Sequence, residues 1–215
     1  MKLVAKALIL AAACGLTANG VAAEAPLAGD AEAGKDKAGA CTACHGADGN
    51  SMVPNFPKLA GQGERYTVKQ LKDIKSGARP VPEMMGIVPN LSEQDMADLA
   101  AFYASQPIKA GAADPALVEL GQKLFRAGKP GVTACAGCHG ATGNGMPEAG
   151  FPALAGQHAA YTEAQLKAFR AAGRQDHEGK RRENDGESKM MRATAAQLSD
   201  DDIKALASYI SGMYQ

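Results

Sequence analysis

The sequence contains no tryptophan, and aromatic residues make up only 5% of its 215 positions. Hydrophobic residues reach 46%, which argues against global disorder, but glycine alone accounts for 25 residues. Two domains of about 90 residues each would have thin cores, and domains of that size often need a staple or a bound group for stability. The composition therefore indicates that something other than side chains fills the centre of the fold.

The chain also lacks an excess of charge, because 23 lysines and arginines balance 23 aspartates and glutamates. A nucleic-acid-binding domain usually concentrates positive charge, so we expect no nucleic-acid partner. Long apolar runs are missing as well, since the stretch at residues 7–16 is too short to span a bilayer.

The first 23 residues have the pattern of an export signal. Lys2 and Lys6 flank the start of the apolar stretch, and Val21-Ala22-Ala23 fits a small-residue cleavage site. We therefore predict a signal peptide at residues 1–23, cleaved after Ala23, and a soluble periplasmic protein. A retained anchor is the alternative, and peripheral membrane association stays open.

The rest of the sequence is an internal duplication. Cys41-Thr42-Ala43-Cys44-His45 recurs 94 positions later as Cys135-Ala136-Gly137-Cys138-His139, followed each time by Phe-Pro-x-Leu-Ala-Gly-Gln and then Tyr-x-x-x-Gln-Leu. So long a period suits a duplicated domain rather than a solenoid unit. We expect domains at residues 24–106 and 115–215, joined by a linker at 107–114.

Helical patterns predict an all-α fold in both copies. Ser92 and Ser199 begin capping-box-like sequences, followed by apolar residues at helical spacing. Asp114 precedes a proline suited to the first position of a helix that runs through Phe125. Two further helices, beginning near residues 66 and 161, are expected to end at Gly77 and Gly173. No segment has the alternation typical of a strand.

The Cys-x-x-Cys-His motif is the attachment signature of c-type haem. In a turn entering a helix, both thiols point to one side and can form thioethers with the two porphyrin vinyl groups, and the histidine becomes the proximal iron ligand. Three other roles fit less well. A redox dithiol would need a βαβ setting, and a zinc site would need a fourth ligand. A disulfide between cysteines separated by two residues would close a loop so small that it constrains the chain little. Two motifs in matching contexts therefore predict two covalently bound haem c groups.

The duplication also nominates a second axial ligand for each iron. Met84 and Met191 each lie seven positions before a duplicated Leu-Ser pair, whereas the neighbouring Met85 and Met190 have no counterpart. Methionine opposite histidine raises the reduction potential of a haem. Gap-filling core packing is the alternative role for both methionines.

These motifs together resemble the dihaem cytochrome c4 family over residues 28–214. The resemblance implies two class I cytochrome c folds facing each other, with haems near the interface and a role in bacterial respiratory electron transfer. It implies that one haem is held by Cys41, Cys44, His45 and Met84, and the other by Cys135, Cys138, His139 and Met191. The first copy has a shorter loop before its methionine, so Met85 stays an alternative to Met84.

Other residues are candidates for supporting roles. The carbonyls of Pro57 and Pro152 could hold the histidines, as in similar cytochromes. Gly34 and Gly121 could let the final helix of each copy approach closely, beneath Phe102 or Tyr209.

Two histidines lie outside the motifs. His158 is expected to be exposed or to bond a haem propionate. His177 lies in a mixed-charge insertion at residues 175–185, which we expect to be a solvated loop, with a docking surface for a redox partner as the alternative.

The expected function is that of a non-enzymatic single-electron carrier, a donor to a terminal oxidase. Its partners would be redox proteins, either membrane respiratory complexes or periplasmic dehydrogenases. One alternative is a cytochrome subunit of a larger oxidoreductase, such as flavocytochrome c sulfide dehydrogenase. A dihaem peroxidase is the other, although it would need an open iron position and distal acid–base groups.

Overall fold

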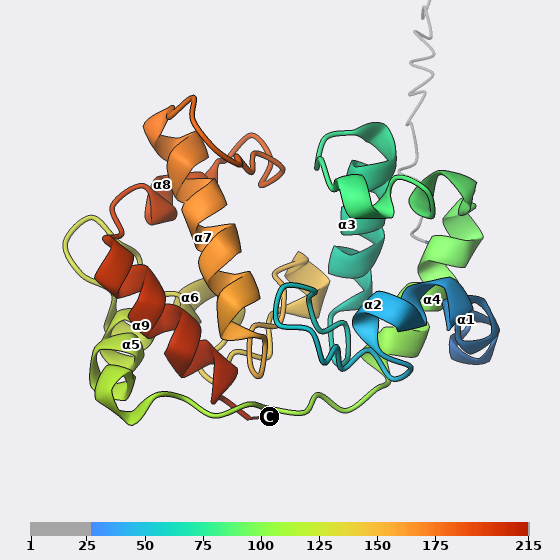
Figure 1. Ribbon diagram of the computed structural model, residues 1–215, viewed down its shortest axis with the longest axis horizontal. Helices are drawn as coiled ribbons and strands as arrows, with labels where there is room; N and C mark the ends of the chain where they lie inside the picture. The colour runs from blue at the N-terminus through green and yellow to red at the C-terminus, as the bar shows by residue number, and fades with distance from the viewer. Residues whose placement is uncertain (1–26, 215) are drawn as a thin grey trace, which may run out of the picture.

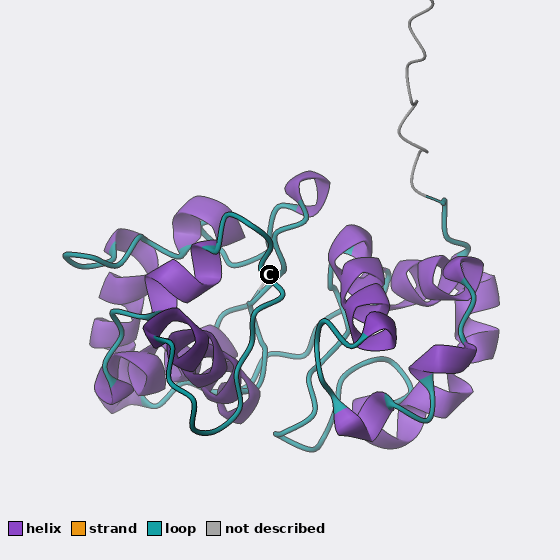
Figure 2. Cartoon of the chain, turned by 90° about the horizontal axis from the view of Figure 1, so that it is seen from above, coloured by secondary structure: helices purple, strands orange, loops and turns teal. Residues whose placement is uncertain are grey.

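The computed structural model describes residues 27–214, so the predicted signal peptide at residues 1–23 lies outside the described residues. The chain forms two helical lobes that lie side by side, connected by one extended segment (Figures 1 and 2). Within residues 27–214 there is no strand, only two isolated bridges in the second lobe. The predicted all-α class and its duplication are confirmed. None of the described helices is both long and apolar enough to cross a membrane.

The two lobes repeat one order of elements. The N-terminal lobe contains α1 (Ala31–Lys37), α2 (Thr42–His45), α3 (Glu64–Ser76) and α4 (Glu93–Ala104). The C-terminal lobe contains α5 (Pro115–Ala127), α6 (Ala136–His139), α7 (Ala159–Arg174), α8 (Met190–Ala195) and α9 (Asp200–Ser211). Where the C-terminal lobe has α8, the N-terminal lobe has only the short 3₁₀ helix η2 (Pro82–Met84).

The first and last helices of each lobe cross at a glycine. A Cβ atom built on Gly34 would lie 2.0 Å from the backbone oxygen of Asp98, and one on Gly121 would lie 2.4 Å from that of Ala205. The nearest side-chain atoms are the Cβ atoms of Phe102 and Tyr209, as predicted. No larger residue fits at either crossing, so the two glycines set how closely α1 packs on α4 and α5 on α9.

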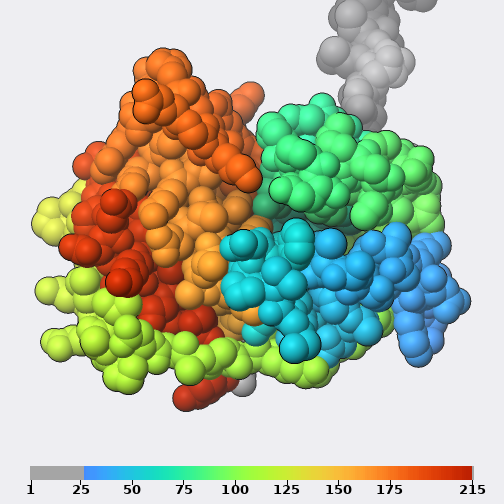
Figure 3. Space-filling model, viewed as in Figure 1, coloured from blue at the N-terminus to red at the C-terminus, as the bar shows by residue number. Residues whose placement is uncertain are grey.

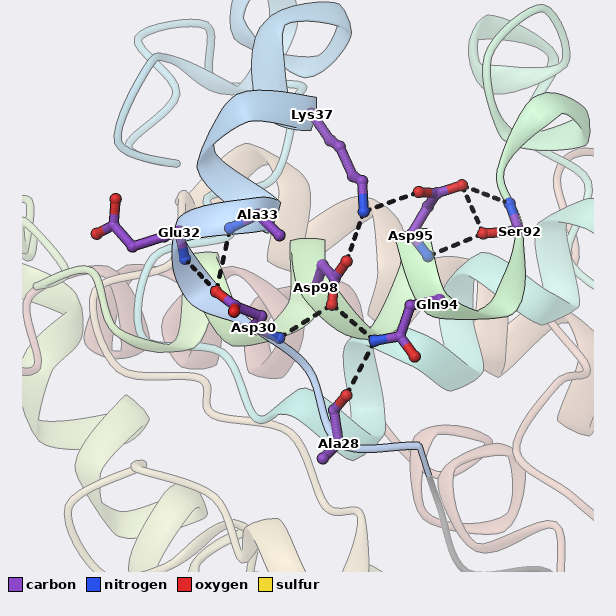
Figure 4. A network of polar contacts seen from close by, with 9 residues as sticks. All are labelled: Ala28, Asp30, Glu32, Ala33, Lys37, Ser92, Gln94, Asp95 and Asp98. Carbon is purple, nitrogen blue, oxygen red and sulfur yellow. Dashed lines mark hydrogen bonds and ion pairs between the residues drawn. The ribbon is translucent and has the colours of Figure 1, made fainter.

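A polar network ties the start of the N-terminal lobe to α4 (Figure 4). The carboxylate of Asp98, whose residue is 2% exposed, accepts hydrogen bonds from the backbone N–H of Asp30 at 2.9 Å and from the amide of Gln94 at 2.8 Å. Lys37 on α1 donates to its second oxygen. The C-terminal lobe repeats this contact with Lys129 and Asp202.

The helix ends mostly follow the sequence signals. Ser92 and Ser199 both form complete capping boxes, and Gly77 ends α3 in the left-handed conformation with φ of 81°. The prediction that Gly173 ends α7 is wrong, because the helix continues and Gln175 takes the left-handed position with φ of 59°. Gly173 is instead a close-approach position, where a Cβ would lie 2.2 Å from the backbone oxygen of Arg192.

The segment between the lobes lies against both of them. The backbone N–H of Lys109 donates to Asn50 Oδ1 at 2.8 Å, and Asn50 Nδ2 donates to the carbonyl of Pro107 at 3.0 Å. Further along, the N–H of Gly111 donates to the carbonyl of Ser211 at 2.9 Å. These hydrogen bonds hold the connection extended along the lower edge of the molecule in Figure 1.

We predict that Gly34→Ala destabilises the protein by about 1–3 kcal/mol, because the added methyl forces α1 away from α4. Gly39→Ala is the matched control in the same lobe, since a Cβ there meets nothing within 4 Å. Denaturant unfolding of both haem-loaded variants measures the difference. An equal loss of unfolding free energy in the two variants would show that the helix crossing tolerates a side chain.

We also predict that Asp98 makes the N-terminal lobe acid-sensitive. The hydrogen bond from Lys37, with those from Asp30 and Gln94, lowers the pKa of Asp98 to about 2. An unfolded aspartate has a pKa of about 3.9, so this stabilisation is complete above about pH 4 and is lost as the pH falls toward 2.

Asp98→Asn should therefore lower the unfolding temperature at pH 7 and lower it less at pH 2. The control is Asp36→Asn, at an exposed position of α1. Thermal unfolding followed by circular dichroism at both pH values checks this. The same deficit at pH 2 as at pH 7 would contradict the assignment.

Candidate functional site

The two Cys-x-x-Cys-His motifs form single helical turns. Cys41 and Cys135 occupy the N-cap positions of α2 and α6, and the histidine is the last residue of each helix. All four motif cysteines are free and half-buried. One turn of helix places residues three and four apart on the same face. The local geometry therefore presents two thiols and an imidazole from each five-residue segment.

Burial disfavours the thiolate form of the first cysteine of each motif. It raises the pKa of Cys135 to about 11 and also raises that of Cys41. Redox dithiols of the thioredoxin type depend instead on a lowered thiol pKa. The environment of these motifs is thus unlike that of a dithiol oxidoreductase.

A backbone carbonyl fixes the tautomer of each motif histidine. The Nδ1 atom of His45 lies 2.8 Å from the carbonyl oxygen of Pro57, and that of His139 lies 2.9 Å from that of Pro152. Since a carbonyl oxygen can only accept, Nδ1 carries the proton and Nε2 carries the lone pair. The predicted role of both prolines is confirmed.

The protein also keeps both imidazoles neutral. His45 is 7% exposed and His139 is 5% exposed. Burial lowers the pKa of each histidine, while the hydrogen bond to the proline carbonyl acts in the opposite direction. Phe56 and Phe151 pack edge-on against the two rings, at centroid distances of 6.3 and 6.4 Å. Each site thus has an oriented neutral imidazole, the form that binds a metal ion.

Of each methionine pair, one side chain lies against the core and the other is exposed. Met191 packs half-buried on the same hydrophobic cluster as Cys135. Met84 packs half-buried on a cluster that shares Leu91 with the one beside Cys41. Met85 is 53% exposed and Met190 is 44% exposed.

The structure reveals two arginines that the sequence patterns did not single out. Arg182 is 8% exposed and donates to the hydroxyl of Tyr66 at 3.0 Å and to Gln70 Oε1 at 2.9 Å. Arg79 donates to the hydroxyl of Tyr161 at 2.8 Å. Each guanidinium therefore reaches the tyrosine of the other lobe, so the arginines bridge the interface as a pair.

The expected solvated loop at residues 175–185 is therefore only partly correct. His177 is exposed, but Arg182 and Asn184 are buried and contact α3 of the other lobe. The expectation for His158 also changes, because it is half-buried and its Nε2 lies 2.7 Å from the carbonyl oxygen of Ser51 across the interface. The signal for the arginine site was present in the duplicated Tyr-x-x-x-Gln-Leu, whose polar side chains recur one helical turn apart.

The residues present fit haem c. Neither Arg79 nor Arg182 forms an ion pair with a carboxylate among the described residues. A buried guanidinium favours an anionic partner, and haem carries two propionate carboxylates. The thiol pair and the oriented imidazole of each motif are suited to a covalently attached haem with a histidine ligand.

Comparison with known proteins also points to a c-type cytochrome. The family model named Cytochrome c matches the chain twice, over residues 31–106 and 118–213. The chain is 55% identical over 197 residues to cytochrome c4 of Pseudomonas aeruginosa, covering 91% of this chain and 94% of that protein. It is also 38% identical over 182 residues to the thiosulfate dehydrogenase electron acceptor of Stutzerimonas stutzeri, covering 82% of this chain and 80% of that protein.

The fold has a solved counterpart. The crystal structure of reduced recombinant cytochrome c4 from Pseudomonas stutzeri matches with a TM-score of 0.81 and 54% sequence identity, covering 87% of this chain and 100% of that one. The chain therefore belongs to the cytochrome c family, and within it to the cytochromes c4, dihaem electron carriers in which each of two domains holds one covalent haem c.

Proposed function

We propose that each lobe is one haem domain with a complete set of iron ligands from its own chain segment. The domains are residues 24–106 and 115–215, joined by the linker at 107–114. The first haem is attached by Cys41 and Cys44 and ligated by His45 and Met84. The second is attached by Cys135 and Cys138 and ligated by His139 and Met191. The observation that carries this assignment is the imidazole held by a proline carbonyl at the end of each thiol turn.

The residues favour electron transfer over catalysis. When bound, each haem iron accepts and releases one electron between its Fe(II) and Fe(III) states. The proline carbonyls hold His45 and His139 in one orientation, which limits rearrangement on a change of charge. Thioether sulfur from Met84 and Met191 favours Fe(II) and fills the position that an enzyme would keep open. We infer that the protein is a carrier rather than an enzyme.

We further propose that the carrier is periplasmic and passes electrons toward a terminal oxidase in a bacterial respiratory chain. Its donors and acceptors are then membrane respiratory complexes or periplasmic dehydrogenases. The similarity to a protein described as an electron acceptor of thiosulfate dehydrogenase supports a dehydrogenase as one donor. The comparisons favour neither the flavocytochrome subunit nor the dihaem peroxidase that the sequence left as alternatives.

We predict that Met84→Ala and Met191→Ala each lower the potential of one haem and remove half of the ferric near-infrared methionine–iron band. The reason is the loss of a soft sulfur ligand that favours Fe(II). Met85→Ala and Met190→Ala are the matched controls, since both side chains are exposed. A full band in either ligand variant would show that the wrong methionine had been chosen.

A redox titration of the purified protein tests the carrier function. We expect two one-electron steps, inertness toward peroxide, and no rapid binding of carbon monoxide by the native ferrous protein. Turnover of peroxide or rapid carbon monoxide binding would reveal an open iron position and would favour an enzyme.

A further inference from the structure

The two lobes meet along the middle of the molecule (Figure 3). Across this contact, one glutamine from each lobe bonds the backbone of a residue in the opposite lobe. The side chain of Gln157 accepts from the N–H of Lys58 and donates to its carbonyl, both at 2.9 Å. The side chain of Gln62 accepts from the N–H of Ala153 at 2.9 Å and donates to its carbonyl at 3.0 Å. These residues occupy equivalent positions in the duplicated loop, so the contact has the form of an isologous two-fold interface.

The same peptide groups hold the motif histidines. The N–H of Lys58 and the carbonyl of Pro57 belong to one peptide unit, and that carbonyl accepts from His45. An unbroken hydrogen-bonded chain therefore leads from His45 through this peptide to Gln157 in the other lobe. The equivalent chain leads from His139 through the Pro152–Ala153 peptide to Gln62.

The surroundings of this hydrogen-bonded chain allow it to transmit polarisation. Gln62, Gln157 and Lys58 are 7–8% exposed, and Ala153 is 9% exposed, so little water competes for these bonds. Hydrogen bonds in such surroundings strengthen one another, because an acceptor on the N–H of a peptide increases the negative charge on its carbonyl oxygen. A more negative carbonyl binds the imidazole N–H more strongly and makes the imidazole a better electron donor to a metal.

The orientation of both amides is also well defined. Each glutamine faces a carbonyl with its nitrogen and an N–H with its oxygen, and that oxygen accepts a second hydrogen bond from the next residue of its own lobe, Gly63 or His158. A flipped amide would place oxygen against oxygen and leave both N–H groups without an acceptor.

We propose that each lobe tunes the haem of the other: Gln157 lowers the reduction potential of the haem ligated by His45, and Gln62 lowers that of the haem ligated by His139. The proposal rests on the ligand assignment in the proposed function. Both glutamines are positioning residues, since they act on the iron through a peptide group and an imidazole. Stronger donation by the imidazole stabilises Fe(III), which lowers the potential.

The test measures the two potentials separately in Gln157→Leu and Gln62→Leu. Gln157→Leu should raise the potential of the haem in the N-terminal lobe, and Gln62→Leu that of the haem in the C-terminal lobe. We expect up to about a tenfold change in the one-electron equilibrium constant, which corresponds to about 59 mV. Nuclear magnetic resonance of the ferrous protein should show an upfield shift of the Nδ1 proton of His45 in Gln157→Leu alone.

Two further variants separate tuning from loosening of the interface. Arg65→Met removes an exposed hydrogen bond to the carbonyl of Glu148, which also joins the lobes but contacts neither proline peptide. It should leave both potentials and both Nδ1 protons unchanged. Gln157→Glu keeps an acceptor oxygen toward Lys58, so its potential should stay at or below that of the wild type.

The proposal would be overturned if the reduction potential changed only in the haem of the lobe that carries the substitution. Equal changes in the potentials of both haems would also overturn it. If the leucine variants fail to fold, hydrogen exchange of the wild type decides: the amides of Lys58 and Ala153 should exchange slowly, and rapid exchange of both would overturn it. Failure of the proposed function is distinguishable, because the wild type would then lack two haems with histidine and methionine ligands.

Discussion

Each lobe depends on one hydrogen bond, from Nδ1 of its motif histidine to the carbonyl of a proline 12 or 13 residues later. This bond fixes which ring nitrogen keeps its lone pair, and it ties the thiol turn to the loop that follows it. The leucine two residues after each proline packs beside the core, and the glutamine five residues after it binds the other lobe. The same short loop thus orients the motif histidine, packs against the core of its own lobe and contacts the other lobe.

Much of the fold could be predicted because its signals are local or duplicated. Ser92 and Ser199 cap helices through contacts with residues three positions away, which sequence patterns identify directly. Gly34 and Gly121 recur at equivalent places of the duplication, where two backbones lie in contact. The thiol turns and their histidines follow from spacing alone. The covalent haems predicted from these motifs also explain why so few large side chains are available for either core.

The contacts between the lobes could not be predicted, because they depend on how the two lobes are placed relative to each other. Arg182 lies in an insertion of mixed charge, and nothing in that segment shows that a tyrosine of the other lobe will cover it. The contact of His158 with the carbonyl of Ser51 depends on the same placement. Gln62 and Gln157 were visible as a repeated residue, but their exchange of hydrogen bonds appears only when the loops face each other. Within the C-terminal lobe, the role of Gly173 was equally hidden from the sequence, since it depends on the backbone of Arg192, 19 positions later.

The central claim is that each lobe is built around a haem joined covalently to its own cysteine pair. Intact-mass spectrometry of the purified protein, produced in a host that matures c-type cytochromes, tests it most directly. The account predicts the mass of the polypeptide plus two haem groups, which remain attached after denaturation. A polypeptide without added prosthetic mass, or haem that is lost on denaturation, would contradict it.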